Sequence, residues 1–315
     1  VSIIGCGSAM HAGLVGRMLI ESLAGIPVTV DLASEYRYAP PVTVGHTLAV
    51  PVSQSGETSD TLQALRLARK NGLSSLGVIN VVGSAIARES DAVMYTGAGP
   101  EIAVATTKGY ASQVTVLAML AVKLGYLRGR IGAERASELC HSLADVLPAN
   151  IAEIISRRPE IAELAKKIYS HDDLFYIGRG PDCAAAPECS LKLKEISYIH
   201  SEAYAAGELK HGTLSLVTEG TPVIALATDP KYYDKMTGNI REVKSRGGYV
   251  ILVAAPDFPS PDEYADDVFV LPAVDPTLSP LESAVFSQLL AYEAALLRGC
   301  DVDHPRNLAK SVTVE

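Results

Sequence analysis

The first half of the chain alternates short apolar runs with longer amphipathic segments. The short runs are rich in β-branched residues and predict strands at residues 1–4, 28–32, 47–52, 75–79 and 92–95. The longer segments have helical spacing and predict helices at residues 10–23, 58–71 and 104–124. Strands and helices that alternate in this way predict an α/β fold, a parallel sheet flanked by helices on both faces.

The second half of the chain repeats this pattern. The segment "FYIGRG" (175–180) echoes "SIIGCG" (2–7), and "ADDVFV" (265–270) echoes "SDAVMY" (90–95), at an offset of about 175 residues. A repeat with so long a period predicts two similar αβ domains.

We therefore divide the chain into four parts. The first domain spans residues 1–132 and the second spans 164–300, with a helical linker at 133–163 that we expect Pro148 to break. Residues 301–315 form a C-terminal tail. Because the chain opens directly on a strand pattern without a start methionine, we expect it to be part of a longer parent protein.

Composition narrows the class of protein. The chain is 48% hydrophobic and 20% charged, which is ordinary for a soluble protein, and its net charge of −9 argues against a nucleic-acid surface. No uninterrupted apolar run reaches the roughly 20 residues that span a bilayer. The five cysteines form no CxxC pair and the seven histidines no HExxH motif, so we expect a cytoplasmic protein without a structural metal.

A hydroxyl-rich stretch, "SQSGET" (53–58), separates a predicted strand from a predicted helix. Ser53, Ser55 and Thr58 offer hydroxyls, Gln54 offers an amide, and Gly56 lets a ligand approach the backbone. The start of a helix also favours an anion, so the stretch is a candidate cradle for a phosphate monoester. It equally fits a plain strand–helix turn with a serine N-cap, and these residues alone do not decide between the two.

The corresponding stretch of the second half has different chemistry. There the chain reads Ala227-Thr228-Asp229-Pro230, and an acidic turn that contains proline is a poor anion site. We therefore expect the two domains to share a fold, with a phosphate cradle in the first domain only.

Ionisable residues gather in "SLKLKEISYIHSEAYAAGELKHGT" (190–213). Glu188, Lys192 and Glu195 share one face of a predicted helix, at i, i+4 and i+3 spacing. One explanation is a surface row of ion pairs, each contributing a few tenths of a kcal/mol. The other is a catalytic group, to which His211 and the tail residue Lys310 would also belong.

Three stretches together resemble one family: "SQSGETSDT" (53–61), "LKLKEISYIHSEAYAAGELKHG" (191–212) and "DVDHPRNLAKSVTVE" (301–315). They are similar to the isomerase half of the glutamine–fructose-6-phosphate aminotransferases, which contains two SIS (sugar isomerase) domains. The resemblance runs across the whole chain. It implies two SIS domains with an ordered C-terminal tail, and conversion of fructose 6-phosphate and ammonia to glucosamine 6-phosphate without a metal or organic cofactor.

The resemblance also implies roles for individual residues. His211 would open the sugar ring, Lys310 would form a Schiff base with the ketone, Glu195 would move a proton between C1 and C2, and Lys192 would tune or relay that proton. Arg306 would anchor the tail over the site. The implied sugar-phosphate contacts are Ser8, Ser53, Gln54, Ser55, Thr58, Val104, Thr106 and Ala309. Two departures from the family pattern are Ala9, which lacks a hydroxyl, and Thr213, which replaces a proline.

The implied partners follow from the same resemblance. Ammonia would come from a glutaminase domain in the parent chain, and the histidine would reach the site of a second subunit, so a homodimer is expected. No nucleic acid or membrane is expected as a partner. Two alternatives stay open: a non-catalytic SIS sensor of sugar phosphates, and an amino-sugar-phosphate deaminase-isomerase or deglycase.

Overall fold

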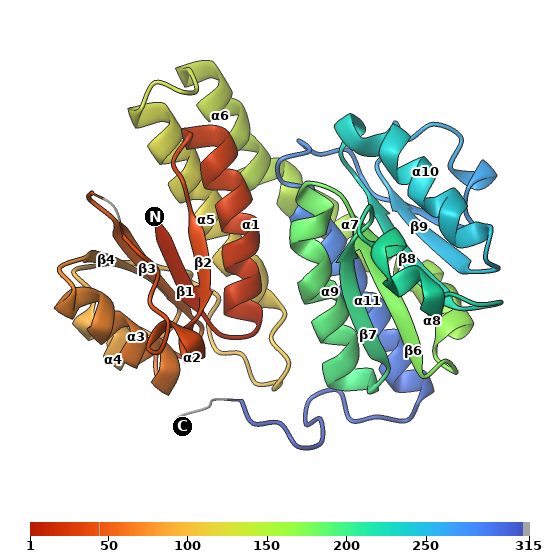
Figure 1. The fold of residues 1–315 in the computed structure, drawn as a ribbon, viewed down its shortest axis with the longest axis horizontal. Coiled ribbons are helices and arrows are strands. Elements are labelled where there is room, and N and C mark those ends of the chain that lie inside the picture. Colours follow the sequence, from red (N-terminus) through yellow and green to blue (C-terminus); the bar gives the residue numbers. More distant parts are fainter. Residues whose placement is uncertain (44, 311–315) are drawn as a thin grey trace. The chain divides into compact units, whose positions relative to one another are not determined.

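The computed structural model describes residues 1–43 and 45–310 (Figure 1). These residues form two units, each built around its own sheet. The first unit comprises Val1–Cys140 together with residues 307–310 of the tail, and the second comprises His141–Arg306. The prediction of two similar α/β domains is confirmed.

The sheet of the first unit has five strands in the order β2-β1-β3-β4-β5, and all its strand pairs are parallel. Two of its three interior strands, β1 and β3, are almost completely buried because helices cover both faces. The strands are β1 (Ser2–Gly5), β2 (Thr29–Leu32), β3 (Leu48–Ser53), β4 (Ser74–Ile79) and β5 (Ala92–Tyr95). They match the predicted strands to within a residue or two.

Neighbouring side chains of β1 point to opposite faces of the sheet, as strand geometry requires. Ile3 lies against Gly13, where a Cβ atom would come within 2.8 Å of the isoleucine. Ile4 packs instead into the cluster on the other face, with Ala33 and Ala64. The helices of this unit are α1 (Ser8–Ala24), α2 (Ala33–Tyr36), α3 (Ser59–Lys70), α4 (Ala85–Glu89), α5 (Lys108–Leu127) and α6 (Ala133–His141).

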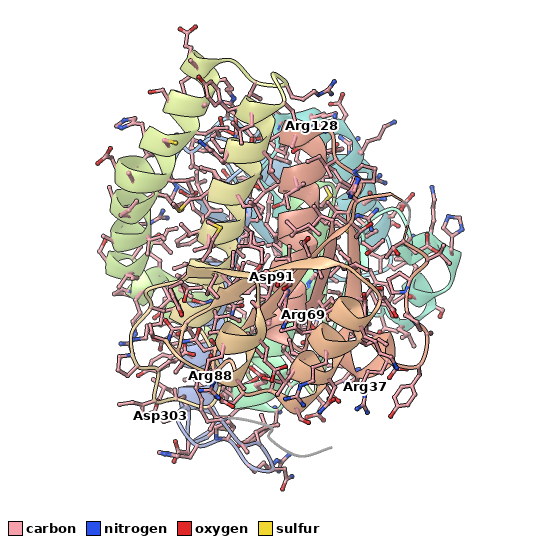
Figure 2. The ribbon with its side chains drawn as sticks, turned by 90° about the vertical axis from the view of Figure 1, so that its left-hand side faces the viewer. Arg37, Arg69, Arg88, Asp91, Arg128 and Asp303 are labelled. Atoms are coloured by element: carbon pink, nitrogen blue, oxygen red, sulfur yellow. The ribbon has the colours of Figure 1, made fainter. Side chains whose placement is uncertain are left out.

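An ion pair links α3 to the segment before the edge strand β5. Arg69, at the end of α3, pairs with Asp91 at 3.1 Å, and both residues are labelled in Figure 2. Asp91 also accepts hydrogen bonds from the backbone N–H and the hydroxyl of Ser75, at 2.8 and 2.9 Å. These bonds explain a lowered pKa of Asp91, with the bonds from Ser75 as the main cause.

The second unit repeats the strand order. Its sheet, β10-β9-β8-β6-β7, reads β7-β6-β8-β9-β10 in the other direction, which is the order of the first sheet. Again every pair is parallel. The strands are β6 (Asp173–Gly178), β7 (His200–Ala205), β8 (Pro222–Ala227), β9 (Tyr249–Ala254) and β10 (Asp267–Val270). The repeat predicted from sequence is therefore a repeat of topology.

The helices of the second unit follow the same plan. The long ones are α7 (Leu147–Ser156), α8 (Arg158–Ile168), α9 (Pro181–Ser197), α10 (Tyr233–Lys244) and α11 (Ser279–Leu297). Helix α11 packs along α9, as α5 packs along α1 in the first unit. Two short 3₁₀ helices, Leu209–His211 and Thr213–Leu216, follow β7.

Two helix predictions were wrong in detail. The helix expected from residue 104 begins at Lys108, because residues before it form a loop in which Glu101 accepts hydrogen bonds from the Thr106 hydroxyl and the Thr107 N–H. Pro148 does not break the linker, since residues 133–156 are helical throughout. Pro148 lies in the first turn of α7, where a helix tolerates its missing N–H. This turn comes directly after a π-helical turn (Ser142–Val146).

Within the described residues, α5 alone has the length and apolar character that could cross a membrane. However, 56% of its most apolar stretch is buried inside the fold. The core helix of a soluble protein passes the same test of length and composition, so α5 is weak support for a membrane span.

Candidate functional site

Hydroxyl groups shape the turn between β3 and α3, residues 53–58, which we call the hydroxyl loop. Ser53 is buried, and its Oγ accepts a hydrogen bond from the Gly56 N–H at 3.0 Å. The same Oγ lies 3.3 Å from the Thr58 hydroxyl, and Ser55 Oγ accepts from the Glu57 N–H at 3.2 Å. The hydroxyls therefore fold the loop tightly and gather at the carboxyl edge of the sheet.

Gly56 is required by both its backbone and its surroundings. Its φ of +66° lies in the left-handed region, and an added Cβ would come within 2.0 Å of the Ser84 hydroxyl. Its carbonyl accepts a hydrogen bond from the Ile86 N–H at 3.0 Å, and the Glu57 carboxylate accepts from the Ala85 N–H at 2.8 Å. The segment after β4 thus holds the hydroxyl loop in place.

The start of α3 lacks a side-chain cap. Thr58 occupies the N-cap position, and its side chain makes no capping hydrogen bond to the helix. The plain alternative from sequence, a serine that caps this helix, is therefore wrong. Uncapped N–H groups and the helix dipole both favour a negatively charged ligand at this end.

Glu101 organises a second part of the same sheet edge. Its carboxylate accepts hydrogen bonds from Thr106 Oγ1 at 2.6 Å, from the Thr107 N–H at 2.9 Å and from the Gly109 N–H at 3.2 Å. It also accepts one from Lys310 Nζ at 2.7 Å. Burial alone raises the pKa of Glu101, but the hydrogen bonds from Lys310, Thr106 and the two N–H groups outweigh burial and lower it. Glu101 is therefore an ionised, nearly buried carboxylate.

Gln54 connects the hydroxyl loop to this cluster. A Cβ atom added at Gly109 would lie 2.4 Å from Thr106 Oγ1 and 2.9 Å from Gln54 Oε1, so glycine is what allows these side chains to meet. Gln54 Oε1 is buried and has no hydrogen-bond partner among the residues that the structure describes. The first unit therefore brings together four of the residues predicted from sequence, Ser53, Gln54, Thr58 and Thr106, with Lys310.

Glu101 was missed in the sequence. A usable signal exists, because Glu101 is the one charged residue between positions 96 and 107, next to the predicted hydroxyl pair. The other predicted contacts of this unit have less definite surroundings. Ser8 is buried at the first position of α1, Val104 is half-buried in the loop before α5, and Ala309 is exposed.

In the second unit, α9 carries a buried group of three charges. Lys192 Nζ lies 2.5 Å from Glu195 Oε2 and 3.3 Å from Glu188 Oε1. The side chains of Lys192 and Glu188 are 2% and 1% exposed, and that of Glu195 is 21% exposed. The explanation of this row as surface ion pairs is therefore wrong.

The electrostatic environment keeps Lys192 charged. Burial by itself lowers the pKa of Lys192, but the two carboxylates outweigh burial and raise it above the ordinary lysine value. Glu195 Oε2 forms the shorter of the two ion pairs, at 2.5 Å from Lys192 Nζ. Glu195 is the carboxylate of this group that solvent and a ligand can reach.

His211 follows strand β7 in the same unit. It is exposed at the end of a 3₁₀ helix, and within residues 1–43 and 45–310 no hydrogen bond to its ring is found. Gly212 follows with a φ of +153°, and Thr213 opens the next 3₁₀ helix, a first-turn position that proline also tolerates. The substitution of proline by threonine therefore leaves the turn formed.

The tail is attached to the second unit through Arg306. Its guanidinium lies 4.1 Å above the centre of the Tyr198 ring, and its backbone N–H donates to the Tyr198 hydroxyl at 2.8 Å. Pro305 beside it is buried. This contact is a cation–π interaction supported by a hydrogen bond, and it fixes where the tail leaves the domain.

Metal-binding groups are not apparent in the part of the chain that the structure describes. No cluster of three or more His, Cys, Asp or Glu residues there has the geometry to hold a metal ion. The five cysteines, all among the described residues, are free thiols.

Comparison with known proteins agrees with the two-domain architecture. The SIS domain family model matches residues 1–123 and 167–298, one segment in each unit. The chain therefore belongs to the SIS domain family.

Particular relatives narrow the comparison further. The chain is 55% identical over all 315 residues to the glutamine–fructose-6-phosphate aminotransferase [isomerizing] of Symbiobacterium thermophilum, and 49% identical to that of Thermus thermophilus. It spans about half the length of the curated relatives it matches, 52% in both cases.

A solved structure identifies which half is matched. The C-terminal domain of glucosamine-fructose-6-phosphate aminotransferase from Francisella tularensis superposes with a TM-score of 0.92 at 36% identity, over 96% of this chain and 86% of that structure. The glucosamine-6-phosphate deaminase of Thermotoga maritima, at 24% identity and a TM-score of 0.79, shares the fold.

Proposed function

We propose that this chain is the sugar-isomerase half of a glutamine–fructose-6-phosphate aminotransferase (isomerizing). It would convert fructose 6-phosphate and ammonia to glucosamine 6-phosphate and water. The observation that carries the proposal is the hydrogen-bonded set of Lys310, Glu101 and Thr106 beside the hydroxyl loop. An amine nucleophile next to an anion cradle is what Schiff-base chemistry on a sugar phosphate needs.

The hydroxyl loop would hold the phosphate. Ser53, Ser55 and Thr58 supply hydroxyls, the uncapped start of α3 supplies N–H groups, and the helix dipole adds favourable potential. The buried amide of Gln54 lies between the loop and Thr106, so it would orient the sugar chain from phosphate towards the reacting carbons. Val104, Thr106, Ser8 and Ala309 would contact the sugar.

Lys310 would supply the nucleophile. Lys310 would first release to water the proton of the ammonium that pairs with Glu101. Its neutral amine would then add to the C2 ketone of the open-chain sugar, and loss of water would leave a Schiff base. Ammonia then replaces the lysine amine at C2, which leaves a ketimine and returns free Lys310. Glu101 holds Nζ at 2.7 Å before the sugar arrives and so fixes where the attack begins.

The proton transfers are assigned to the second unit. His211 would open the ring, because an imidazole both takes and gives a proton near neutral pH. Glu195 would remove a proton from C1 of the ketimine and return it to C2, which gives the aldehyde at C1 and the amine at C2. Lys192 would keep Glu195 in place through the 2.5 Å ion pair, while Arg306 would anchor the tail.

The partners follow from the family. A glutaminase domain in a longer parent protein would release ammonia from glutamine, and a homodimer would let His211 serve the neighbouring subunit. The location would be the cytoplasm. No metal or organic cofactor, nucleic acid or membrane is part of the proposal.

The first test is the isomerisation of fructose 6-phosphate to glucose 6-phosphate by the purified chain. Lys310→Ala should abolish it, whereas Lys70→Ala, an exposed lysine at the end of α3, should leave it unchanged. Sodium borohydride with fructose 6-phosphate should add the mass of a reduced sugar phosphate to Lys310. Sugar-phosphate binding without turnover or trapping would instead indicate a sensor. Ammonia release from glucosamine 6-phosphate faster than its formation would indicate a deaminase.

A further inference from the structure

A tyrosine in a strained backbone conformation ends helix α9. Tyr198 occupies the C-cap of α9 with a φ of +61° and a ψ of +16°, in the left-handed region. Helices commonly end on a left-handed residue, but that residue is usually glycine, because a side chain at this φ crowds its own backbone. A chain keeps such a conformation only where its surroundings enforce it, so the contacts of Tyr198 indicate its role.

The side chain of Tyr198 holds the tail at Arg306. Its ring centre lies 4.1 Å from the Arg306 guanidinium, and its hydroxyl accepts a hydrogen bond from the Arg306 backbone N–H at 2.8 Å. One contact fixes the side chain of Arg306 and the other fixes its backbone. We call these two contacts the tail anchor.

The residue before Tyr198 is attached to the start of the same C-terminal segment. The Ser197 carbonyl accepts a hydrogen bond from Arg298 Nη1 at 3.0 Å, and the Cys300 thiol donates to the same oxygen at 4.0 Å. Arg298 follows α11 directly. Two consecutive residues at the end of α9 therefore hold both ends of the segment 298–306.

The chain turns directly after the tail anchor and then reaches Lys310. Asn307 has a φ of +62°, and within the described part of the chain it is one of three non-glycine residues with a positive φ, Tyr198 being another. Asparagine tolerates this conformation, whereas a bulky residue such as tyrosine does so rarely. Arg306 is the last residue of the second unit, and Lys310 follows four residues later as part of the first.

Helix α9 also carries the proposed proton-transfer group. Glu195 lies three residues before Tyr198, within a single turn of helix. A tail that is held by Tyr198 at Arg306 is therefore held to the same rigid element as Glu195. Without the anchor, the last residues before Lys310 would sample many backbone conformations, and a smaller fraction of chains would be ready to react.

We propose that Tyr198 is a positioning residue for Lys310. It acts through Arg306, because its ring and hydroxyl fix the tail at the point from which the next four residues carry the amine to the sugar. The left-handed backbone is retained because these contacts require the tyrosine side chain at this place. The role rests on the proposed function, since it needs Lys310 to be the nucleophile.

The decisive variant is Tyr198→Gly, because glycine is the residue that a left-handed C-cap prefers. If Tyr198 only ended the helix, glycine would keep the chain stable and leave the tail unchanged. If Tyr198 holds the tail, brief digestion with trypsin, followed by mass spectrometry, should cut after Arg306 roughly tenfold faster or more, as expected for the loss of a hydrogen bond and a cation–π contact. Cleavage of a segment that opens and closes rapidly follows the population of its open form.

The second readout is borohydride trapping of fructose 6-phosphate on Lys310, which should slow by a similar factor in Tyr198→Gly. Tyr198→Phe keeps the ring and loses only the hydroxyl, so both rates should change less, roughly fivefold. The matched control is Tyr169→Gly, which removes an exposed tyrosine from the C-cap of α8, where the backbone is ordinarily helical. This control should leave both rates unchanged.

Urea unfolding checks that each variant is folded, and if Tyr198→Gly is not, Tyr198→Phe decides by the same two rates. The proposal is overturned if the folded Tyr198→Gly chain is cut no faster than the parent, or if it is cut faster but trapped at the parent rate. A parent chain that traps no sugar would refute the proposed function and this role with it. The cleavage rates would still show whether Tyr198 holds the tail, so the two failures are distinguishable.

Discussion

The buried charges of α9 predict a large loss of stability when Lys192 is replaced by methionine. Methionine retains most of the side-chain volume but removes the ammonium that lies between Glu188 and Glu195. Glu188 is 1% exposed, so its carboxylate loses a counter-charge that water cannot replace. Removal of one partner from a buried pair typically costs about 3–5 kcal/mol, against at most about 1 kcal/mol for an exposed pair. We therefore expect Lys192→Met to lower the free energy of unfolding by about 3–5 kcal/mol, the cost typical of a buried pair.

Urea unfolding followed by far-UV circular dichroism suits this chain, which has no tryptophan. The matched control is Arg17→Met, since Arg17 and Glu21 form an i,i+4 pair at 3.2 Å whose side chains are 52% and 39% exposed. If Lys192→Met loses no more stability than Arg17→Met, the argument from burial fails. Adding Glu188→Gln to Lys192→Met should recover part of the loss, because it removes the stranded charge.

Three further predictions concern single side chains. Glu101→Gln replaces the carboxylate that Lys310 contacts, and borohydride trapping of fructose 6-phosphate on Lys310 should slow roughly tenfold by mass spectrometry, as expected when one charged hydrogen bond is lost. Unchanged trapping would mean that the contact does not position the lysine. Glu282→Gln should stabilise the chain by up to about 3 kcal/mol above pH 8 and little at pH 4. In the parent chain, the protonated Glu282 carboxyl contributes its full stability below the pKa of the unfolded chain. That contribution is lost as pH rises through the folded pKa, which burial raises to about 7. An equal shift in melting temperature at both pH values would contradict this. Gly56→Ala should destabilise by more than about 1 kcal/mol in urea unfolding, from the left-handed backbone and the contact with Ser84. Adding Ser84→Gly to Gly56→Ala should recover only the part of the lost stability that comes from the contact with Ser84, because the left-handed backbone remains.

The fold was largely predictable because its signals are local. Buried parallel strands are short and apolar, and the helices that cover them are amphipathic. The alternation of these two kinds of segment along the chain therefore predicted both sheets. The start of α5 was not predictable in this way. Residues 104–107 have helical spacing, but Glu101 accepts the hydroxyl and N–H hydrogen bonds that hold them in a loop.

The site was predictable only in part, for a related reason. The hydroxyl loop is continuous in sequence, so its chemistry could be recognised. The spacing of Glu188, Lys192 and Glu195 placed them on one face of a helix, but it could not show that this face is buried. The elements packed around α9 include α11, roughly a hundred residues further along. The contact between Glu101 and Lys310 joins residues 209 positions apart, and no local pattern reports it.

The two units show how one topology can present opposite charge at the same edge. In the first, Thr58 leaves the N–H groups at the start of α3 uncapped, and an anion can take them. In the second, Asp229 accepts the Lys231 N–H at 3.0 Å, and Pro230 has no N–H to offer. The chain thus supplies its own carboxylate where the first unit would bind a phosphate.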